Sequence, residues 1–300
     1  MLETLTQCPV CGTNEFKNFL TCQDYTVTQE QFAIVQCTNC GFKFTNPRPN
    51  EAHIGRYYQS EDYISHSNTK KGLINRVYHV VRNRALKGKL KLVNQLVGQQ
   101  PKQLLDIGCG TGFFLDTCKA NGWEISGSEP DPKTRDFAAQ QVGIEIQPDI
   151  FTEKFQPQQF SVITMWHVLE HVHQLDRTIE RLQALLHDQG TLVVAVPNAN
   201  AHETQNFEAT WAAYDVPRHL YHFTPETMTP LFERHGFRVE KHLPMYFDSY
   251  YISMLSQKYK TGKNNYPKAF LQGWKSNQWA KKHNNNYSSV IYIIRKAPRS

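Results

Sequence analysis

The fold is decided by one stretch of the chain, Gln103-Leu104-Leu105-Asp106-Ile107-Gly108-Cys109-Gly110-Thr111-Gly112-Phe113-Phe114-Leu115. Its apolar beginning is typical of a short buried strand, and its end is typical of a helix. Glycine recurs at every second residue from Gly108 to Gly112, so the backbone can turn sharply between the two elements. The free N–H groups at the start of the helix then face a ligand. The stretch therefore predicts a ligand site between a strand and a helix.

The spacing of the glycines separates two kinds of cofactor site. The dinucleotide fingerprint is Gly-x-Gly-x-x-Gly, whereas this chain has Gly-x-Gly-x-Gly with an aspartate two residues before it. The residues alone predict a pocket for an adenosyl ligand on an α/β sheet. The pattern Asp-x-Gly-x-Gly-x-Gly resembles motif I of the class I S-adenosylmethionine-dependent methyltransferases. The resemblance implies that the loop holds the amino-acid end of this cofactor with Asp106, Gly108, Cys109, Gly110 and Gly112.

Length and composition bound the class of protein. The chain has 300 residues, of which 40% are hydrophobic, which suffices for a packed core with an appendage or for two domains. It has no run of about 18 apolar residues, so we expect no membrane-spanning helix. The segment 1–5 lacks the charged and apolar regions of a signal peptide. These features together predict a cytoplasmic protein.

The positive charge is unevenly distributed. The formal net charge is +6, and the segments 63–105 and 249–300 contain no acidic residue. Basic segments of this kind attract phosphate, nucleic acid or an anionic membrane surface. They are also typical of solvated helix faces and tails. Both interpretations stay open, and peripheral membrane contact is one of them.

Four of the seven cysteines form two Cys-x-x-Cys-Gly pairs, at Cys8, Cys11, Cys37 and Cys40. Four thiolates complete a closed tetrahedral Zn²⁺ site of the structural kind. Apolar runs at 16–20 and 32–36 fit the strands of a zinc ribbon, whose metal supplies much of its folding energy. Iron in a rubredoxin-like site and a redox-active cysteine pair are the alternatives. Cys22 lies outside the spacing and is expected to be a buried small side chain.

The chain divides into three parts. We predict a zinc-ribbon-like domain at 1–48, a connector with basic helices at 49–100, and a catalytic domain at 101–300 with an insertion at 244–288. The connector begins with the rigid segment Pro47-Arg48-Pro49. A zinc ribbon that leads through such a segment resembles a small-molecule subset of the methyltransferases, in which the ribbon flanks the active site.

Strands and helices alternate from residue 101 onward, which predicts a doubly wound, mostly parallel sheet. The expected strands are 103–107, 123–128, 144–147, 160–166, 190–196, 237–243 and 289–295. The expected helices are 112–121, 132–142, 174–187 and 225–235. Seven strands in this order are similar to the Rossmann-like class I methyltransferase fold. That resemblance implies that the last strand is inserted antiparallel.

Ligands of such sheets lie beyond the carboxyl ends of the strands. Glu129 follows the second strand, about twenty residues after the glycines, where a carboxylate can accept hydrogen bonds from both ribose hydroxyls. The alternative role, a helix cap, suits Asp131 better. The resemblance further implies that Asp149 and Ile150 meet the adenine. It also implies that Trp166 and His167 flank the cofactor.

The segment after the fourth strand continues with Leu169-Glu170-His171-Val172, which resembles the corresponding segment of the family. Glu170 and His171 either face the end of the sheet or cap the next helix. For His171 a structural role and a catalytic role both stay open.

A long polar loop at 199–224 follows the fifth strand, and loops of this length usually have a function. Its segment Arg218-His219-Leu220-Tyr221-His222 resembles one that lies over the transferable methyl group in methyltransferases of small molecules. A histidine suits the removal of the acceptor's proton, so we predict His219 or His222 as the base. Arg218 would hold an anionic or carbonyl group, and Asp215 would orient an imidazole or the acceptor. Alternatively, His222 only joins the loop to the helix that starts at Thr224.

The insertion carries an aromatic stripe with helical spacing, Tyr266, Phe270, Leu271 and Trp274. Such a stripe is most often part of a core, and a lid over the acceptor or a helix lying on a membrane are the alternatives.

Three functions remain. The first is a methyltransferase that acts on a small-molecule acceptor such as a sugar, a nucleotide-sugar or a lipid-linked intermediate, with anionic acceptors among the candidates. The second is an RNA or protein methyltransferase that uses the ribbon and the basic helix. The third is a non-catalytic zinc-ribbon protein that senses the cofactor. The segment 166–171 lacks the Asn/Asp-Pro-Pro-aromatic motif of RNA-base enzymes, which weighs against nucleic acid.

Overall fold

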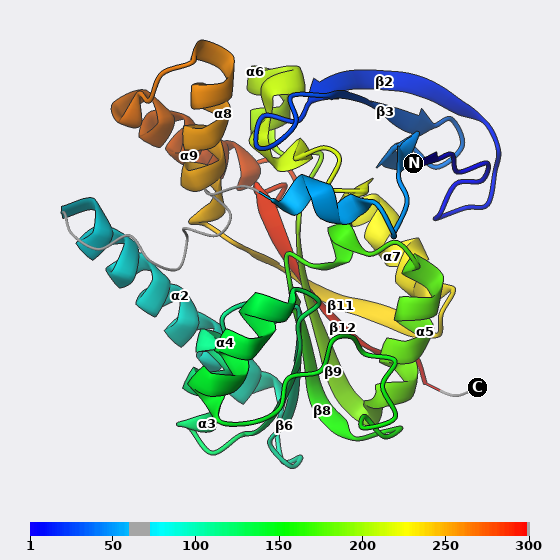
Figure 1. Ribbon diagram of the computed structural model, residues 1–300, viewed down its shortest axis with the longest axis vertical. Helices are drawn as coiled ribbons and strands as arrows, with labels where there is room; N and C mark the ends of the chain where they lie inside the picture. Colours follow the sequence, from blue (N-terminus) through cyan, green and yellow to red (C-terminus); the bar gives the residue numbers. More distant parts are fainter. Residues whose placement is uncertain (60–72, 299–300) are drawn as a thin grey trace.

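The computed structural model describes residues 1–59 and 73–298, with 73–80 described by their backbone only. Part of the connector predicted at 49–100 therefore lies outside the described residues. A central sheet has the strand order β11-β12-β9-β8-β6-β7 (Figure 1). Its strands are β6 (Gln103–Ile107), β7 (Glu124–Ser128), β8 (Phe160–Trp166), β9 (Leu186–Pro197), β11 (Phe237–Pro244) and β12 (Ser289–Lys296).

The sheet has the predicted doubly wound, mostly parallel form, but with six described strands instead of seven. Strands β6 to β9 are parallel, and β12 lies antiparallel between β9 and β11. The third predicted strand, 144–147, is reduced to one bridge between Ser128 and Gln147. The next residue is Pro148, which has no N–H group with which to extend the ladder.

Helices cover both faces of the sheet (Figure 1). One face carries α2 (Leu73–Leu96), α3 (Phe113–Lys119) and α4 (Pro132–Val142). The other face carries α5 (Leu175–Leu185) and α7 (Pro225–Glu233). Side chains alternate between the faces, since Leu104 packs in one core cluster and Leu105 in the other. Burial on both faces explains why these strands are almost entirely apolar.

The N-terminal part forms a second sheet of order β10-β4-β3-β2. Its strands are β2 (Phe16–Gln23), β3 (Gln31–Cys37), β4 (Lys43–Thr45) and β10 (Tyr221–His222), and a separate pair is formed by β1 (Leu2–Glu3) and β5 (Arg48–Pro49). Strand β10 comes from the long loop of the catalytic domain, where Tyr221 pairs with Phe44. Phe42 and Phe44 are buried in the same core cluster as α5 and α7. The ribbon sheet is thus joined by backbone pairing and by a shared core to the long loop 199–224, the proposed acceptor loop.

The remaining elements lie near the end of the sheet at which the parallel strands finish (Figure 1). They are the 3-10 helices η1 (Ile54–Tyr58), η2 (Leu169–His171), η3 (Glu208–Thr210) and η4 (Ala212–Tyr214), and the helices α6 (His202–Phe207), α8 (Asp248–Thr261) and α9 (Tyr266–Ala280). The ribbon and these elements together cover the edge at which ligands are expected.

The aromatic stripe of α9 is exposed, contrary to the expectation that it belongs to the core. Phe270 is 63% exposed and Trp274 is 48% exposed. The buried face of α9 consists of small residues, because α8 passes very close: a Cβ atom on Gly273 would lie 2.8 Å from the Cα of Tyr250. The small residues turn the aromatic side chains outward.

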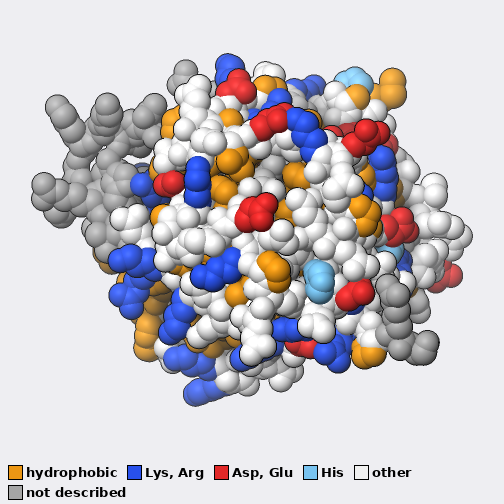
Figure 2. Space-filling model, turned by 90° about the horizontal axis from the view of Figure 1, so that it is seen from below, with side chains coloured by type: hydrophobic (Ala, Val, Ile, Leu, Met, Phe, Trp, Pro, Cys, Tyr) orange, Lys and Arg blue, Asp and Glu red, His pale blue; other side chains and the backbone are white. Residues whose placement is uncertain are grey.

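No helix among residues 1–59 and 73–298 is both long and apolar enough to cross a membrane. Lys and Arg side chains gather at the left of the face in Figure 2, the side on which α2 lies in Figure 1. Arg84, Lys87 and Lys91 of α2 are exposed.

Candidate active site

The carboxyl ends of β6, β7 and β8 lie side by side. Ile107, the last residue of β6, pairs with Ser128 on one side and with Met165 on the other. The glycine loop, Glu129 and the segment after Trp166 therefore leave the sheet at the same edge. Three distant parts of the sequence meet at this edge, as expected for a ligand site of such sheets.

The glycine loop combines close packing with open backbone. Gly108, Gly110 and Gly112 have positive φ angles of 62°, 54° and 78°. A Cβ atom on Gly108 would lie 2.6 Å from Cγ2 of Val168, whereas one on Gly110 would meet no described atom within 4 Å. Gly108 thus lets the segment after β8 pack on the loop, and Gly110 leaves the backbone accessible to a ligand.

Glu129 is held across this loop. Its Oε2 accepts a hydrogen bond from the N–H of Gly110 at 3.0 Å, and its Oε1 accepts one from the N–H of Asp131 at 3.1 Å. Burial raises the pKa of the Glu129 carboxyl, although these N–H groups oppose the shift. Asp131 caps α4 by accepting from the N–H of Thr134 at 2.8 Å. The carboxylate of Glu129 is therefore oriented at the loop, and the capping role falls to Asp131.

Buried Asp106 and half-buried Lys89 are close enough for their charges to interact. Asp106 is 3% exposed, and its Oδ1 accepts a hydrogen bond from Thr164 at 2.6 Å. Burial raises the pKa of Asp106 to about 7, with Thr164 and Lys89 opposing. Lys89 lies 4.2 Å from the ring centre of Trp166. Lys89 was missed from the sequence, although a lysine on the apolar stripe of a helix was a usable signal.

The residues at this edge fit the cofactor that the glycine pattern implies. The indole Nε1 of Trp166 is buried and has no hydrogen-bond partner in the described part of the chain. Burial lowers the pKa of Lys89, although Asp106 and Asp248 oppose this. An unpaired donor, an ammonium group and a carboxylate on an open loop together suit a ligand with ribose and amino-acid groups.

The other predicted cofactor residues have local structural contacts. Asp149 is exposed, and its Oδ1 accepts from the N–H of Phe151 at 2.6 Å. Ile150 is 4% exposed and packs in the core. The N–H of Cys109 donates to the carbonyl of Ser128 at 3.0 Å, which ties the glycine loop to β7.

His167 bridges two carboxylates. Its Nε2 lies 2.9 Å from Asp248 and its Nδ1 lies 3.3 Å from Glu170. Burial alone would lower the pKa of His167, but Asp248 and Glu170 raise it to about 10, so both ring nitrogens donate at neutral pH. His167 thus fixes Glu170 and the start of α8. Asp248 was missed, because nothing in the sequence places the insertion at this edge.

A cluster is formed by Glu170, His171 and His219. One carboxylate oxygen of the glutamate and one ring nitrogen of each histidine lie within 4.8 Å of one another. The rings of His171 and His219 meet edge to face at 4.7 Å. Asp215, predicted to orient an imidazole, has its Oδ2 3.9 Å from Nε2 of His219. Burial and His219 lower the pKa of His171 to about 4, which keeps that ring neutral. The cluster contains one of the two predicted bases, His219.

His222 has a different environment. It is 4% exposed, and its Nε2 lies 3.3 Å from Oγ1 of Thr45 in the ribbon sheet. Burial, with the charges of His219 and Lys43, lowers the pKa of His222 well below its ordinary value. Such a ring binds a proton poorly, so we assign His222 to packing between β10 and β4 and leave His219 as the proposed base.

Arg218 is held entirely by the protein. Its guanidinium donates to Asp24 at 3.0 Å, to Asp215 at 2.6 Å and to the carbonyl of Tyr57 at 2.8 Å. Its side chain is 2% exposed. These partners occupy the guanidinium, so Arg218 is not free to hold the methyl acceptor as expected. We assign it instead a positioning role between the ribbon, η1 and the long loop 199–224. Asp24 was missed, since it lies 194 residues away.

Replacing Asp24 by Asn should lower the free energy of unfolding by about 3 kcal/mol at neutral pH, because it breaks a buried ion pair. Burial alone would raise the pKa of Asp24, but the N–H of Thr28 and the charge of Arg218 lower it below its ordinary value of 3.8. A carboxyl whose pKa is lowered by folding stabilises the folded state at pH values above its ordinary pKa. This stabilisation is lost as the pH falls through the folded-state pKa. Denaturant titrations should therefore show that the difference between wild type and variant begins to shrink below about pH 4 and is lost as the pH falls through the folded-state pKa of Asp24. A constant difference in acid would contradict this role.

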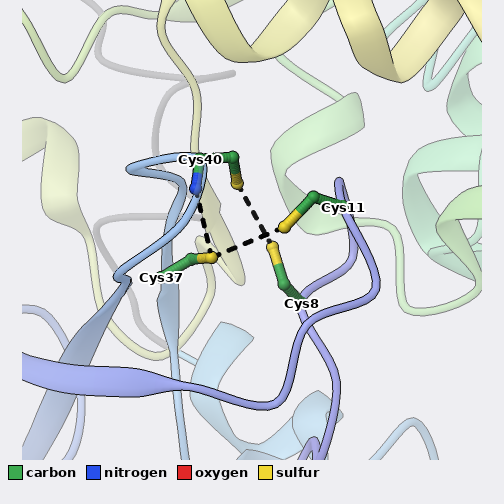
Figure 3. A group of neighbouring side chains, drawn as sticks. All are labelled: Cys8, Cys11, Cys37 and Cys40. Atoms are coloured by element: carbon green, nitrogen blue, oxygen red, sulfur yellow. Dashed lines mark hydrogen bonds between the residues drawn. The ribbon is translucent and has the colours of Figure 1, made fainter.

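Figure 3 shows the four cysteines pointing toward a common centre from two loops. The Sγ atoms of Cys8 and Cys40 lie 3.5 Å apart, as do those of Cys11 and Cys37. Tetrahedral zinc with four thiolates separates the sulfurs by about 3.8 Å. The N–H of Cys40 points at Sγ of Cys37 at 3.4 Å. The cluster therefore fits one tetrahedral metal ion in a zinc-ribbon-like motif.

Comparison with known sequences finds enzymes named as O-methyltransferases. The ubiquinone biosynthesis O-methyltransferase of Coxiella burnetii is 30% identical over 118 residues, which cover 37% of this chain and 50% of the relative. The enzyme of the same name from Aeromonas salmonicida is 27% identical over 188 residues, which cover 57% of this chain and 76% of the relative. The chain thus spans about half the length of the Coxiella burnetii relative.

Solved structures share the fold. The geranyl diphosphate C-methyltransferase of Streptomyces coelicolor A3(2) is 12% identical with a TM-score of 0.51, covering 72% of this chain and 80% of that one. The phosphoethanolamine N-methyltransferase 2 of Haemonchus contortus is 15% identical with a TM-score of 0.50, and the match covers 71% of this chain and 53% of that one. At these identities the likeness concerns the fold alone.

A family model described as a methyltransferase domain matches residues 79–242, more than half of the chain. This range contains the glycine loop, Glu129 and the segment after β8. The chain therefore belongs to the methyltransferase domain family, and the protein is a class I S-adenosylmethionine-dependent methyltransferase with a zinc-ribbon-like motif at its N-terminus.

Proposed function

We propose that this methyltransferase transfers the methyl group to a hydroxyl oxygen of a small-molecule acceptor. The observation that carries the proposal is the cluster of Glu170, His171 and His219, in which the first two residues follow β8 and His219 comes from the long loop after β9. Val168, which packs on Gly108, joins this cluster to the glycine loop.

The chemistry needs alignment of the acceptor and loss of its proton. When bound, S-adenosylmethionine supplies a methyl group that its sulfonium already activates. Glu129 would accept hydrogen bonds from the ribose hydroxyls, and Gly110 would let the ligand approach the backbone. The cluster would receive the proton of the acceptor's hydroxyl, since His219 Nε2 carries a lone pair once Nδ1 donates to the carbonyl of Ala213 at 2.8 Å.

The surroundings of the cluster favour a small acceptor. The side chain of Glu170 is 0% exposed and that of His219 is 12% exposed. The hydroxyl of Tyr58 lies 3.0 Å from Nδ1 of His171, so the connector covers the cluster as well. A sugar, a nucleotide-sugar or a lipid-linked intermediate offers a hydroxyl on a small group. Oxygen as the acceptor atom agrees with the names of the Coxiella burnetii and Aeromonas salmonicida relatives.

We further propose that Cys8, Cys11, Cys37 and Cys40 bind structural Zn²⁺. The ribbon would then support the acceptor loop through β4 and β10, rather than take part in the chemistry. A closed set of four thiolates leaves no coordination position for a substrate.

The protein should label small molecules when given methyl-labelled S-adenosylmethionine and a cell extract divided into small molecules, RNA and protein. The label is expected in the small-molecule fraction, on an ether oxygen of the product. Label in the RNA or protein fraction would contradict the proposal and favour a macromolecular acceptor held by the basic helix.

The variant His219→Asn should lower kcat/KM by about 100-fold, the usual share of a proton-transfer group. Its affinity for S-adenosylhomocysteine should stay unchanged, because His219 lies on the acceptor side. The control is His53→Asn, an exposed histidine beside Asn50, which should keep full activity. Full activity of His219→Asn would remove this residue from the reaction.

A further inference from the structure

Three side chains with metal-binding atoms meet beyond the end of β8. Glu170 and His171 belong to η2, and His219 lies in the loop before β10. The potential ligand atoms of the three lie within 4.8 Å of one another. One cation at the centre of such a group would be within coordination distance of all three after small side-chain shifts.

Both imidazoles are hydrogen-bonded to backbone carbonyls through Nδ1. Nδ1 of His171 lies 3.0 Å from the carbonyl of Arg218, and Nδ1 of His219 lies 2.8 Å from the carbonyl of Ala213. A carbonyl oxygen only accepts, so these hydrogen bonds place the proton on each Nδ1 and leave a lone pair on each Nε2. The hydroxyl of Tyr58, 3.0 Å from Nδ1 of His171, then acts as a second acceptor of that proton. A ring N–H donated to a backbone carbonyl is the usual support of a metal-binding histidine.

Glu170 provides an independent observation. Its side chain is 0% exposed, and Oε1 receives His167 at 3.3 Å. Its second oxygen, Oε2, is buried and has no hydrogen-bond partner within the described ranges 1–59 and 73–298. A buried carboxylate oxygen without a donor is costly. A bound cation would satisfy it.

We propose that Glu170, His171 and His219 bind one divalent first-row transition-metal cation, separate from the metal of the four cysteines. Two imidazole nitrogens and one carboxylate oxygen suit such a cation and leave coordination positions open. The open positions distinguish this site from the closed thiolate site, and they allow a ligand from outside the protein to complete the coordination.

The role of the cation rests on the proposed function. The cation would coordinate the hydroxyl oxygen of the acceptor and lower its pKa, so that the proton passes to water. The oxygen then forms a bond to the methyl carbon as the bond from carbon to sulfur breaks. The electron pair of that bond stays on sulfur, which becomes a neutral thioether. With its Nε2 lone pair on the cation, His219 would be a ligand of the cation in place of the direct acceptor of the proton.

The test is a titration of Co²⁺ into the full-length protein whose cysteine site carries zinc, verified by mass spectrometry. Calorimetry should give one Co²⁺ per chain, and the visible spectrum should lack the charge-transfer bands of thiolate ligands. The variants Glu170→Gln and His219→Asn should bind Co²⁺ about 100-fold more weakly or not at all.

The matched control is Glu203→Gln. Glu203 is also buried, at 1% exposure, and its Oε1 also lacks a hydrogen-bond partner among the described residues. It lies outside the cluster and accepts instead from Ser276 at 2.5 Å. This variant should bind Co²⁺ like the wild type. Affinity for S-adenosylhomocysteine shows that each variant is folded, and Glu170→Asp, which keeps the charge, should bind Co²⁺ with intermediate affinity.

No Co²⁺ binding to the wild type, or equal binding by wild type, Glu170→Gln and His219→Asn, would overturn the proposal. Unchanged methyl transfer after a chelator removes the second cation, with zinc retained, would overturn the role of the cation while the proposed function stands. Co²⁺ binding that depends on Glu170 and His219 would support the site even where methyl transfer is not observed, and in that case the proposed function alone fails.

Discussion

Replacing Glu129 by alanine is expected to weaken the binding of S-adenosylhomocysteine by about 100-fold or more, as two hydrogen bonds to a charged group are worth about 1.5–3 kcal/mol each. The carboxylate now accepts from the N–H groups of Gly110 and Asp131 at the edge of the sheet. Its loss would remove the proposed ribose partner and also the hydrogen bond that holds the glycine loop. Calorimetry at neutral pH measures the effect directly.

The control for Glu129 lies on the same strand. Glu124 begins β7, is exposed, and accepts from Gln103 at 3.2 Å at the opposite end of the strand. Glu124→Ala should therefore bind the ligand like the wild type. Equal affinity of Glu129→Ala and wild type would show that the ribose lies elsewhere.

Replacing Cys37 by serine is expected to release about one equivalent of zinc and to abolish methyl transfer, because structural zinc sites supply folding free energy. Cys37 ends β3, which pairs with β4, and β4 pairs with β10 of the acceptor loop. Loss of the metal should therefore disturb His219 as well as the ribbon. The melting temperature, the zinc content and the turnover report the three effects.

Cys22→Ala is the matched control for Cys37, since Cys22 is also a buried cysteine of the ribbon sheet but lies outside the metal cluster. It should keep its zinc and most of its turnover. A Cys37→Ser protein that retains both full activity and the wild-type melting temperature would contradict a structural role of the metal.

Local patterns predicted the central sheet well. The strands at 103–107 and 160–166 have the predicted bounds, because each is a short apolar run between clear turn or loop signals. The third strand was predicted at 144–147, but only Gln147 forms a bridge before Pro148 ends the pairing. Apolar alternation gives the propensity of a segment, and the neighbouring residues decide whether a ladder forms.

The site was predictable only where its contacts are local. The glycine loop and Glu129 follow from strand ends and spacing. The partners of Arg218 do not, since Asp24 comes from the ribbon and Tyr57 from η1. The exposure of the aromatic stripe of α9 could not be predicted either, because the orientation of α9 depends on how closely Gly273 approaches α8. Long-range packing, which no single stretch encodes, decided these cases.

The most direct test of the account is the distance from the sulfur of bound S-adenosylhomocysteine to Nε2 of His219 in a crystal structure of the complex. With the acceptor oxygen about 3 Å from the methyl carbon and within hydrogen-bond reach of the cluster, this distance should be about 5–8 Å. The methyl direction should point toward Glu170, His171 and His219. A sulfur that faces away from the cluster, or lies more than about 12 Å from it, would contradict the account.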